Sequence, residues 1–147
     1  MIIKSLDQLN SLSKKVANHL EESDCIYLIG EIGVGKTTFT RYLINYLQEK
    51  EGLKMTEIPS PTFNLLYEYD FKKFKIMHYD LFRIKKKKEL QNLGLFFDEK
   101  KEVKIIEWPI LLKTPKLSKL EIYIDFTKNG SWRKINFKGT GKWKNFK

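Results

Sequence analysis

The stretch "LIGEIGVGKTTFTRY", residues 28–42, decides the fold, because it joins an apolar run to a helical pattern through three glycines and a lysine. Gly30, four further residues and then Gly35-Lys36-Thr37 match the pattern G-x-x-x-x-G-K-[ST]. The preceding "CIYLIG" predicts a short buried strand, and apolar residues at helical spacing predict a helix over 36–49. The pattern therefore has the strand before it and the helix after it that a phosphate-binding loop requires.

The residue types of this loop suit a polyphosphate. Glycines adopt positive φ and carry no Cβ, so successive backbone amides can curl around phosphate oxygens. The helix that starts at Lys36 adds free N–H groups and the positive end of its dipole. We expect Lys36 to bridge the β- and γ-phosphates of a nucleoside triphosphate and the Thr37 hydroxyl to ligate Mg²⁺.

Such a loop also needs a carboxylate near the metal, usually at the end of a neighbouring apolar strand. Two acids fit this position: Asp80 ends the strand-like "KIMHYD", and Glu107 ends "VKIIE". One of them could serve the metal while the other orients the attacking water. Which of the two touches Mg²⁺ stays open at this point.

The remaining patterns alternate between helix and strand. A helix is predicted over residues 6–21, with Ser5 and Gln8 as a capping box, and a short helix over 87–95. Strands are predicted at 64–71, 73–82 and 102–108, and a hairpin is predicted from 119–126 and 132–138. We therefore expect a single α/β domain over residues 1–147, a three-layer P-loop NTPase-like fold whose mixed parallel and antiparallel sheet ends in a C-terminal hairpin.

The formal net charge of +10 raises the question of nucleic-acid binding. Only three of the 28 basic residues are Arg, although Arg is the better residue for bidentate phosphate contacts. The run Lys85 to Lys88 is either a solvated face or a polyanion contact. The tail is either frayed over residues 137–147 or, in "GTGKWKNFK" at 139–147, a basic, aromatic surface for stacking bases.

Targeting signals are also missing from the pattern. No apolar run approaches the roughly 20 residues of a membrane span, and the opening "MIIKSLDQLN" lacks the features of a secretory signal. We expect a cytoplasmic protein without a membrane partner.

Three further stretches, taken with the phosphate loop, resemble the TsaE (YjeE) family, the ATPase of threonylcarbamoyladenosine modification of tRNA. They are "SPTF" at 60–63, "HYDLFR" at 78–83 and "EWP" at 107–109. The chain departs from the family pattern at Val34 and Phe82, and at Leu9 and Ser13 in the first helix. The resemblance implies a protein that binds ATP and Mg²⁺, hydrolyses ATP slowly alone and acts on a complex of TsaB and TsaD. The tRNA is then an indirect partner, with direct contact left open.

The resemblance also implies roles for individual residues. Thr37 and Glu107 would lie at Mg²⁺, and Asp80 would be a catalytically important carboxylate. With Lys36, these two acids are the expected catalytic residues. The phosphates would be held by Gly33, Val34, Gly35, Lys36, Thr37 and Thr38.

Three more residues are candidates for the nucleotide on their chemistry. Thr62 lies in a Pro-stiffened loop, where its hydroxyl either senses a γ-phosphate or belongs to a rigid turn. Trp108 follows Glu107 and either faces nucleotide or a partner, or packs in the core. Arg133, on the final hairpin, either lies over the base or ribose or forms a surface ion pair.

The main alternative function is a small-molecule or nucleoside kinase, which shares the loop and the chain length. Such enzymes need several Arg residues on a lid over the transferring phosphoryl group, and this chain has three Arg in all. A GTP switch is disfavoured because the chain has no N-K-x-D pattern to recognise guanine.

Overall fold

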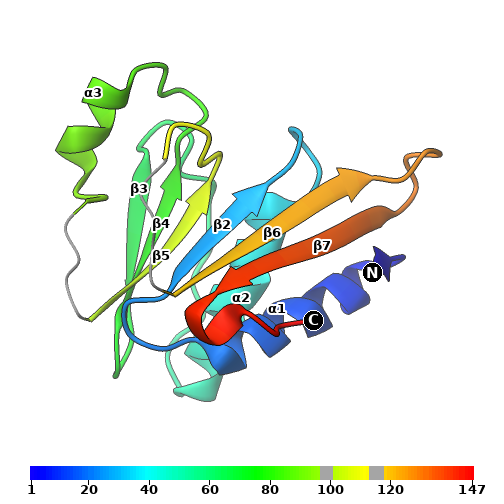
Figure 1. The fold of residues 1–147 in the computed structure, drawn as a ribbon. Helices are drawn as coiled ribbons and strands as arrows, with labels where there is room; N and C mark the ends of the chain where they lie inside the picture. The colour runs from blue at the N-terminus through cyan, green and yellow to red at the C-terminus, as the bar shows by residue number, and fades with distance from the viewer. Residues whose placement is uncertain (97–100, 113–117) are drawn as a thin grey trace.

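The computed structural model describes residues 1–96, 101–112 and 118–147. These residues form a seven-stranded sheet in the order β1-β7-β6-β2-β5-β4-β3 (Figure 1). The strands are β1 (Ile2–Ile3), β2 (Cys25–Ile29), β3 (Leu66–Asp70), β4 (Lys75–Asp80), β5 (Glu102–Glu107), β6 (Lys119–Phe126) and β7 (Arg133–Thr140). The helices are α1 (Leu6–His19), α2 (Lys36–Lys50) and α3 (Lys87–Leu90), with 3₁₀ turns at Gln91–Leu93 and Gly141–Trp143.

The sheet is mixed, as predicted. Strands β6, β2, β5 and β4 run parallel to one another, whereas β7 pairs antiparallel with β6 and β1, and β3 pairs antiparallel with β4. Strands β6 and β7 form the predicted C-terminal hairpin. Glu107 pairs in register with Leu28 on one side and Asp80 on the other, so the carboxyl ends of β2, β5 and β4 meet at one edge. Ligands of open α/β sheets bind at this edge.

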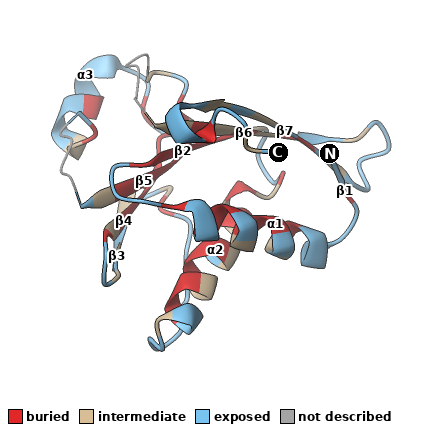
Figure 2. Ribbon diagram, turned by 60° about the horizontal axis from the view of Figure 1, so that its bottom comes forward, coloured by how far each residue is buried: buried red, intermediate tan, exposed pale blue. Residues whose placement is uncertain are grey.

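Helices α1 and α2 lie together on one face of the sheet (Figure 2). Their apolar stripes pack against the alternate residues of the strands that face them, as amphipathic helices do. The Ser5 side chain accepts a hydrogen bond from the Gln8 amide at 3.2 Å, which satisfies one free donor at the start of α1. The main core includes Leu9, Leu12, Val16, Phe39, Leu43, Ile44, Ile26, Leu28, Ile105, Leu120, Ile122 and Ile135.

Among the described residues, short elements cover the opposite face of the sheet. The predicted helix over 87–95 is one turn of α-helix followed by a 3₁₀ turn, which ends at Gly94 with φ +67°. Leu90 is buried there with Met77, Tyr79 and Ile106, and the Tyr79 hydroxyl donates to the Leu93 carbonyl at 2.9 Å. In the described part of the chain, the third layer of the expected fold is thus a small cluster over β2, β5 and β4. The lysines of the run 85–88 are all exposed.

The sequence leaves two alternatives for the tail at 137–147, and the structure, in which this tail is folded, does not support the frayed one. Strand β7 continues to Thr140, and the turn after it buries the Trp143 side chain to 1% exposure. The Trp143 indole donates to Asp24 Oδ1 at 3.0 Å, and its ring packs edge-on against Phe146. The free energy gained by burying the indole and hydrogen-bonding its N–H outweighs the conformational entropy that the tail loses when it is ordered. A buried Trp143 cannot stack on bases either.

Candidate functional site

The loop between β2 and α2 keeps two glycines for clear reasons. At Gly30, with φ +157°, a Cβ would lie 2.2 Å from the Ile124 carbonyl oxygen of β6. At Gly35, which caps the start of α2, the backbone has φ +116°, where other residues are strained. The glycines thus let the chain turn closely from the sheet into the helix.

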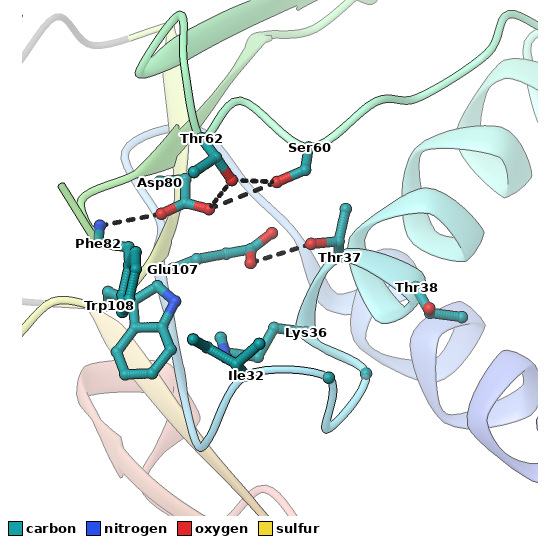
Figure 3. A pocket seen from close by; sticks show the side chains of 12 residues that line it. Ile32, Lys36, Thr37, Thr38, Ser60, Thr62, Asp80, Phe82, Glu107 and Trp108 are labelled. Atoms are coloured by element: carbon teal, nitrogen blue, oxygen red, sulfur yellow. Dashed lines mark hydrogen bonds between the residues drawn. The ribbon is translucent and has the colours of Figure 1, made fainter.

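This loop forms one wall of a cavity of about 310 Å³ at the carboxyl edge of the sheet (Figure 3). The start of α2, the "SPTF" loop and the ends of β4 and β5 supply the rest. The structure therefore brings together most residues that the sequence proposed for the nucleotide. The cavity is lined by Ile32, Gly33, Gly35, Lys36, Thr37, Thr38, Ser60, Thr62, Asp80, Phe82, Glu107 and Trp108.

Lys36 is held inside this cavity by its own loop. Its ammonium donates to the carbonyl oxygens of Gly30 and Glu31, each at 2.8 Å, and lies 4.1 Å from the centre of the Trp108 ring. Burial lowers the pKa of the Lys36 ammonium, while the carboxylates of Glu107 and Asp80 act in the opposite direction. These contacts hold a buried cationic side chain at the wall of the cavity, beside the start of α2.

Glu107 is buried at the end of β5 and has a partner on each oxygen. The Thr37 hydroxyl donates to Oε2 at 3.1 Å, and His78 Nε2 lies 2.8 Å from Oε1 (Figure 3 shows the first contact). A hydroxyl beside a carboxylate is the oxygen donor set that Mg²⁺ takes with substrate phosphates and water. Within the described residues no group of three or more His, Cys, Asp or Glu could hold a metal by itself. The donors present fit Mg²⁺ bound jointly with a nucleotide.

Asp80, the second carboxylate, is held by the "SPTF" loop. Thr62 donates to its Oδ2 at 2.9 Å, with Ser60 at 3.4 Å, and the Phe82 amide donates to Oδ1 at 2.9 Å. Ser60 and Thr62 also bond each other at 2.8 Å. Although Asp80 and Glu107 are neighbours in the sheet, one contacts this loop and the other contacts α2.

Trp108 turns out of β5 into the cavity wall. Its backbone has φ +58°, uncommon for a residue with a bulky side chain. The indole packs against Phe82, with ring centres 4.9 Å apart, and covers the Lys36 ammonium. Trp108 therefore lines this cavity, and it also packs against the apolar cluster that contains Tyr79 and Leu90, so it combines both of the predicted alternatives.

A second cavity, of about 290 Å³, lies on the other side of the loop. Two predicted residues, Val34 and Arg133, line this cavity and not the first. Arg133 Nε donates to the Val34 carbonyl at 2.8 Å, and its guanidinium lies 4.3 Å from the centre of the Phe126 ring. The Val34 side chain is buried in the core. The cavity is lined by Ile3, Lys4, Ser5, Leu6, Leu9, Gly33, Val34, Gly35, Thr38, Ser131, Trp132 and Arg133.

Sequence reasoning missed several residues of this second cavity, above all Ser5, Leu6 and Trp132. They come from the start of α1 and from the β6–β7 turn, which no single motif connects. The available signal was Trp132, which lies between Ser131 and Arg133 on a predicted turn, where a core side chain is not expected.

Comparison with known proteins agrees with the motifs. The family model "Threonylcarbamoyl adenosine biosynthesis protein TsaE" matches residues 3–135. The tRNA threonylcarbamoyladenosine biosynthesis protein TsaE of Rickettsia conorii is 36% identical over 123 residues, which cover 82% of this chain and 68% of the relative. The protein of that name from Rickettsia prowazekii is 35% identical over 125 residues, covering 83% and 84%.

A solved structure shares the fold. The crystal structure of Bacillus subtilis YdiB superposes with a TM-score of 0.70 at 24% identity, and the match covers 96% of this chain and 84% of the other. Among the described residues, no helix has both the length and the apolar character to cross a membrane.

Proposed function

The chain belongs to the TsaE family, whose members take part in threonylcarbamoyladenosine modification of tRNA, and on this premise we propose that it is a Mg²⁺-dependent ATPase that supports TsaB and TsaD in that pathway. The observation that carries the proposal is the meeting of Lys36, Thr37 and Glu107 in one cavity at the loop between β2 and α2. We place this activity in the cytoplasm.

The phosphates occupy the first cavity. The residues at 33–38 supply backbone N–H groups at the start of α2, where the helix dipole favours negative charge. Lys36 leaves the carbonyls of Gly30 and Glu31 for the β- and γ-phosphates, since an anion is a better partner for an ammonium than a carbonyl is. Thr38 lines both cavities and marks the point where the nucleotide passes from one to the other.

The adenosine occupies the second cavity. Trp132 is partly exposed there and offers a flat apolar surface for the base, with Leu6 opposite from α1. Arg133 is fixed by the Val34 carbonyl and by the Phe126 ring, so its guanidinium meets the nucleotide without first losing much side-chain freedom.

The two carboxylates divide the remaining work. Thr37 and Glu107 would hold Mg²⁺, which when bound would neutralise charge on the phosphates. Asp80 accepts a hydrogen bond from the attacking water and so orients it. The Thr62 hydroxyl, which donates to the Asp80 carboxylate at 2.9 Å, keeps that carboxylate in place. Thr62 is thereby close enough to respond to a γ-phosphate in the same cavity.

The surroundings of the cavity favour a protein partner. Four large apolar side chains in and around this cavity are exposed: Ile32 and Phe82 line it, Phe63 follows Thr62 in the chain, and Ile110 lines a neighbouring pocket together with Phe82 and Trp108. Clustered exposed apolar residues mark protein contact sites. We assign this rim to the TsaB–TsaD complex, so that binding of the partner closes the nucleotide from water, and the tRNA is reached through that complex.

The test compares Lys36→Ala with Lys50→Ala, which removes the same charge from the other end of α2. We expect Lys36→Ala to weaken ATP binding by about 100-fold or more, measured by calorimetry, because the phosphates lose their cation. Both variants should unfold in urea at the parent's midpoint, and Lys50→Ala should bind ATP normally. Unchanged ATP affinity in Lys36→Ala contradicts the proposal.

The kinase alternative is separated by following the γ-phosphate. We expect release of inorganic phosphate that rises when TsaB and TsaD are added. Efficient transfer to a nucleoside or a small metabolite would instead make the chain a kinase.

A further inference from the structure

His78 is fully buried on β4, between β5 and the edge strand β3, two residues before Asp80. It pairs in register with Ile105 of β5, which lies two residues before Glu107 at the end of that strand. Its Nε2 lies 2.8 Å from Glu107 Oε1. The function proposed above makes no use of this imidazole.

The other ring nitrogen fixes the position of the proton. Within the described part of the chain, Nδ1 of His78 has no hydrogen-bond partner. A proton on Nδ1 would be a buried donor without an acceptor, which is costly. The Glu107 carboxylate accepts hydrogen bonds, so the geometry selects the tautomer with the proton on Nε2.

Packing alone does not explain a histidine here. The strand position two residues earlier on the same face holds Ile76, which fills the core without any polar atom. An imidazole with an unpaired nitrogen is a poorer filler than an aliphatic side chain, so a buried polar group of this kind points to a role in the site.

The Glu107 carboxylate explains the role. Its side chain has three rotatable bonds, and the contact with Thr37 restrains Oε2 alone. A donor on Oε1 from the opposite side fixes the plane of the carboxylate. Groups that hold a metal-binding side chain in this way strengthen metal binding by about 10–100-fold.

We propose that His78 is a positioning residue, whose Nε2–H holds Glu107 in the orientation that Thr37 and Mg²⁺ need. This inference rests on the proposed function, because it assumes that Glu107 binds Mg²⁺ beside a nucleotide. His78 itself touches neither metal nor nucleotide.

The first test uses two amides of different length. His78→Gln keeps an N–H donor at the reach of Nε2, whereas His78→Asn is one methylene shorter and cannot reach Glu107. We expect His78→Asn to raise the Mg²⁺ concentration for half-maximal binding of a fluorescent ATP analogue by about 10-fold or more. Affinity for the analogue in EDTA should stay within about twofold, and His78→Gln should stay within about threefold of the parent.

The outcomes are decisive. Equal shifts in His78→Asn and His78→Gln, or an unchanged Mg²⁺ requirement in His78→Asn, overturn the inference, and urea unfolding checks that both variants fold. A parent chain that binds no ATP overturns the proposed function, and the role at the metal falls with it. If the parent binds ATP and His78→Asn has the same Mg²⁺ requirement as the parent, the role of His78 is overturned and the proposed function stands.

The second test needs neither ATP nor Mg²⁺. The chain has two histidines, His19 and His78, so a long-range ¹H–¹⁵N spectrum of the imidazoles is simple to assign. We expect His78 to show a protonated Nε2 and an unprotonated Nδ1, and Glu107→Gln to move the His78 signals while those of His19 stay. A proton on Nδ1, or His78 signals that ignore Glu107→Gln, overturn the inference.

Discussion

Two buried carboxylates at opposite ends of the parallel strands show how differently one chemical group can be used. Glu107 ends β5, Asp24 directly precedes β2, and each is 2% exposed. Glu107 has two hydrogen-bond partners and faces a cavity. Asp24 lies where distant parts of the chain meet, and its carboxylate accepts from the Glu21 amide, Ser118, Trp143 and, as an ion pair at 2.7 Å, Lys142.

The comparison teaches that burial of an acid does not identify a functional site. What separates the two is the remaining capacity of the oxygens and the space in front of them. Asp24 is saturated by groups of the protein, so it stabilises the fold. Glu107 is oriented but still open to a ligand, so it can serve a reaction.

The strongest test of the difference between Glu107 and Asp24 is Glu107→Gln, which keeps the shape of the side chain and removes its charge. We expect ATP hydrolysis in the presence of TsaB and TsaD to fall by about 100-fold or more, because a neutral amide is a poor ligand for Mg²⁺. The urea midpoint should stay or rise, since a buried charge is lost. Phosphate release and urea unfolding measure the two effects. A destabilised variant with normal hydrolysis would make Glu107 resemble Asp24.

The matched change at the other end is Asp24→Asn. We expect the free energy of unfolding to fall by about 2 kcal/mol, because an amide cannot replace the charge and all the acceptor positions for Ser118, Trp143 and Lys142. ATP affinity should equal that of the parent. Urea unfolding followed by Trp fluorescence and calorimetry with ATP measure this pair of results. Weaker ATP binding at full stability would contradict the structural role of Asp24.

The smallest expected effect concerns the second cavity and refines the view of the site. We expect Trp132→Ala to weaken ATP binding by about 10-fold, because a stacked base loses its apolar surface. Binding of inorganic tripolyphosphate, which has no base, should not change. Competition against a fluorescent ATP analogue measures both ligands. Equal losses for the two ligands would place Trp132 at the phosphates instead of the base.

The sequence predicted the part of the site that is continuous along the chain. Gly30 to Thr38 form one motif, and the strands that end at Asp80 and Glu107 are apolar runs closed by an acid, so their meeting edge follows from parallel pairing. The contacts of Thr37 with Glu107 and of Thr62 with Asp80 are consistent with this expectation in space. The roles of these residues stay predictions.

The features that sequence did not reveal depend on contacts between remote segments. Trp143 lies 119 residues from Asp24, and no local pattern announces that the tail returns to the start of β2. The second cavity joins the start of α1 to the β6–β7 turn, and His78 reads as an ordinary strand residue until its pairing with β5 is known.

The fold of the tail has a practical consequence for shortening the polypeptide. The family match ends at residue 135, within β7. A chain that ended there would lack Lys138 and Thr140, which pair with β6. The unpaired edge of β6 would favour aggregation with other copies of the chain. It would also lack Trp143, whose side chain is part of the main core. The region that the family model matches is therefore shorter than the folded unit, and a shortened chain should keep residues up to Phe146.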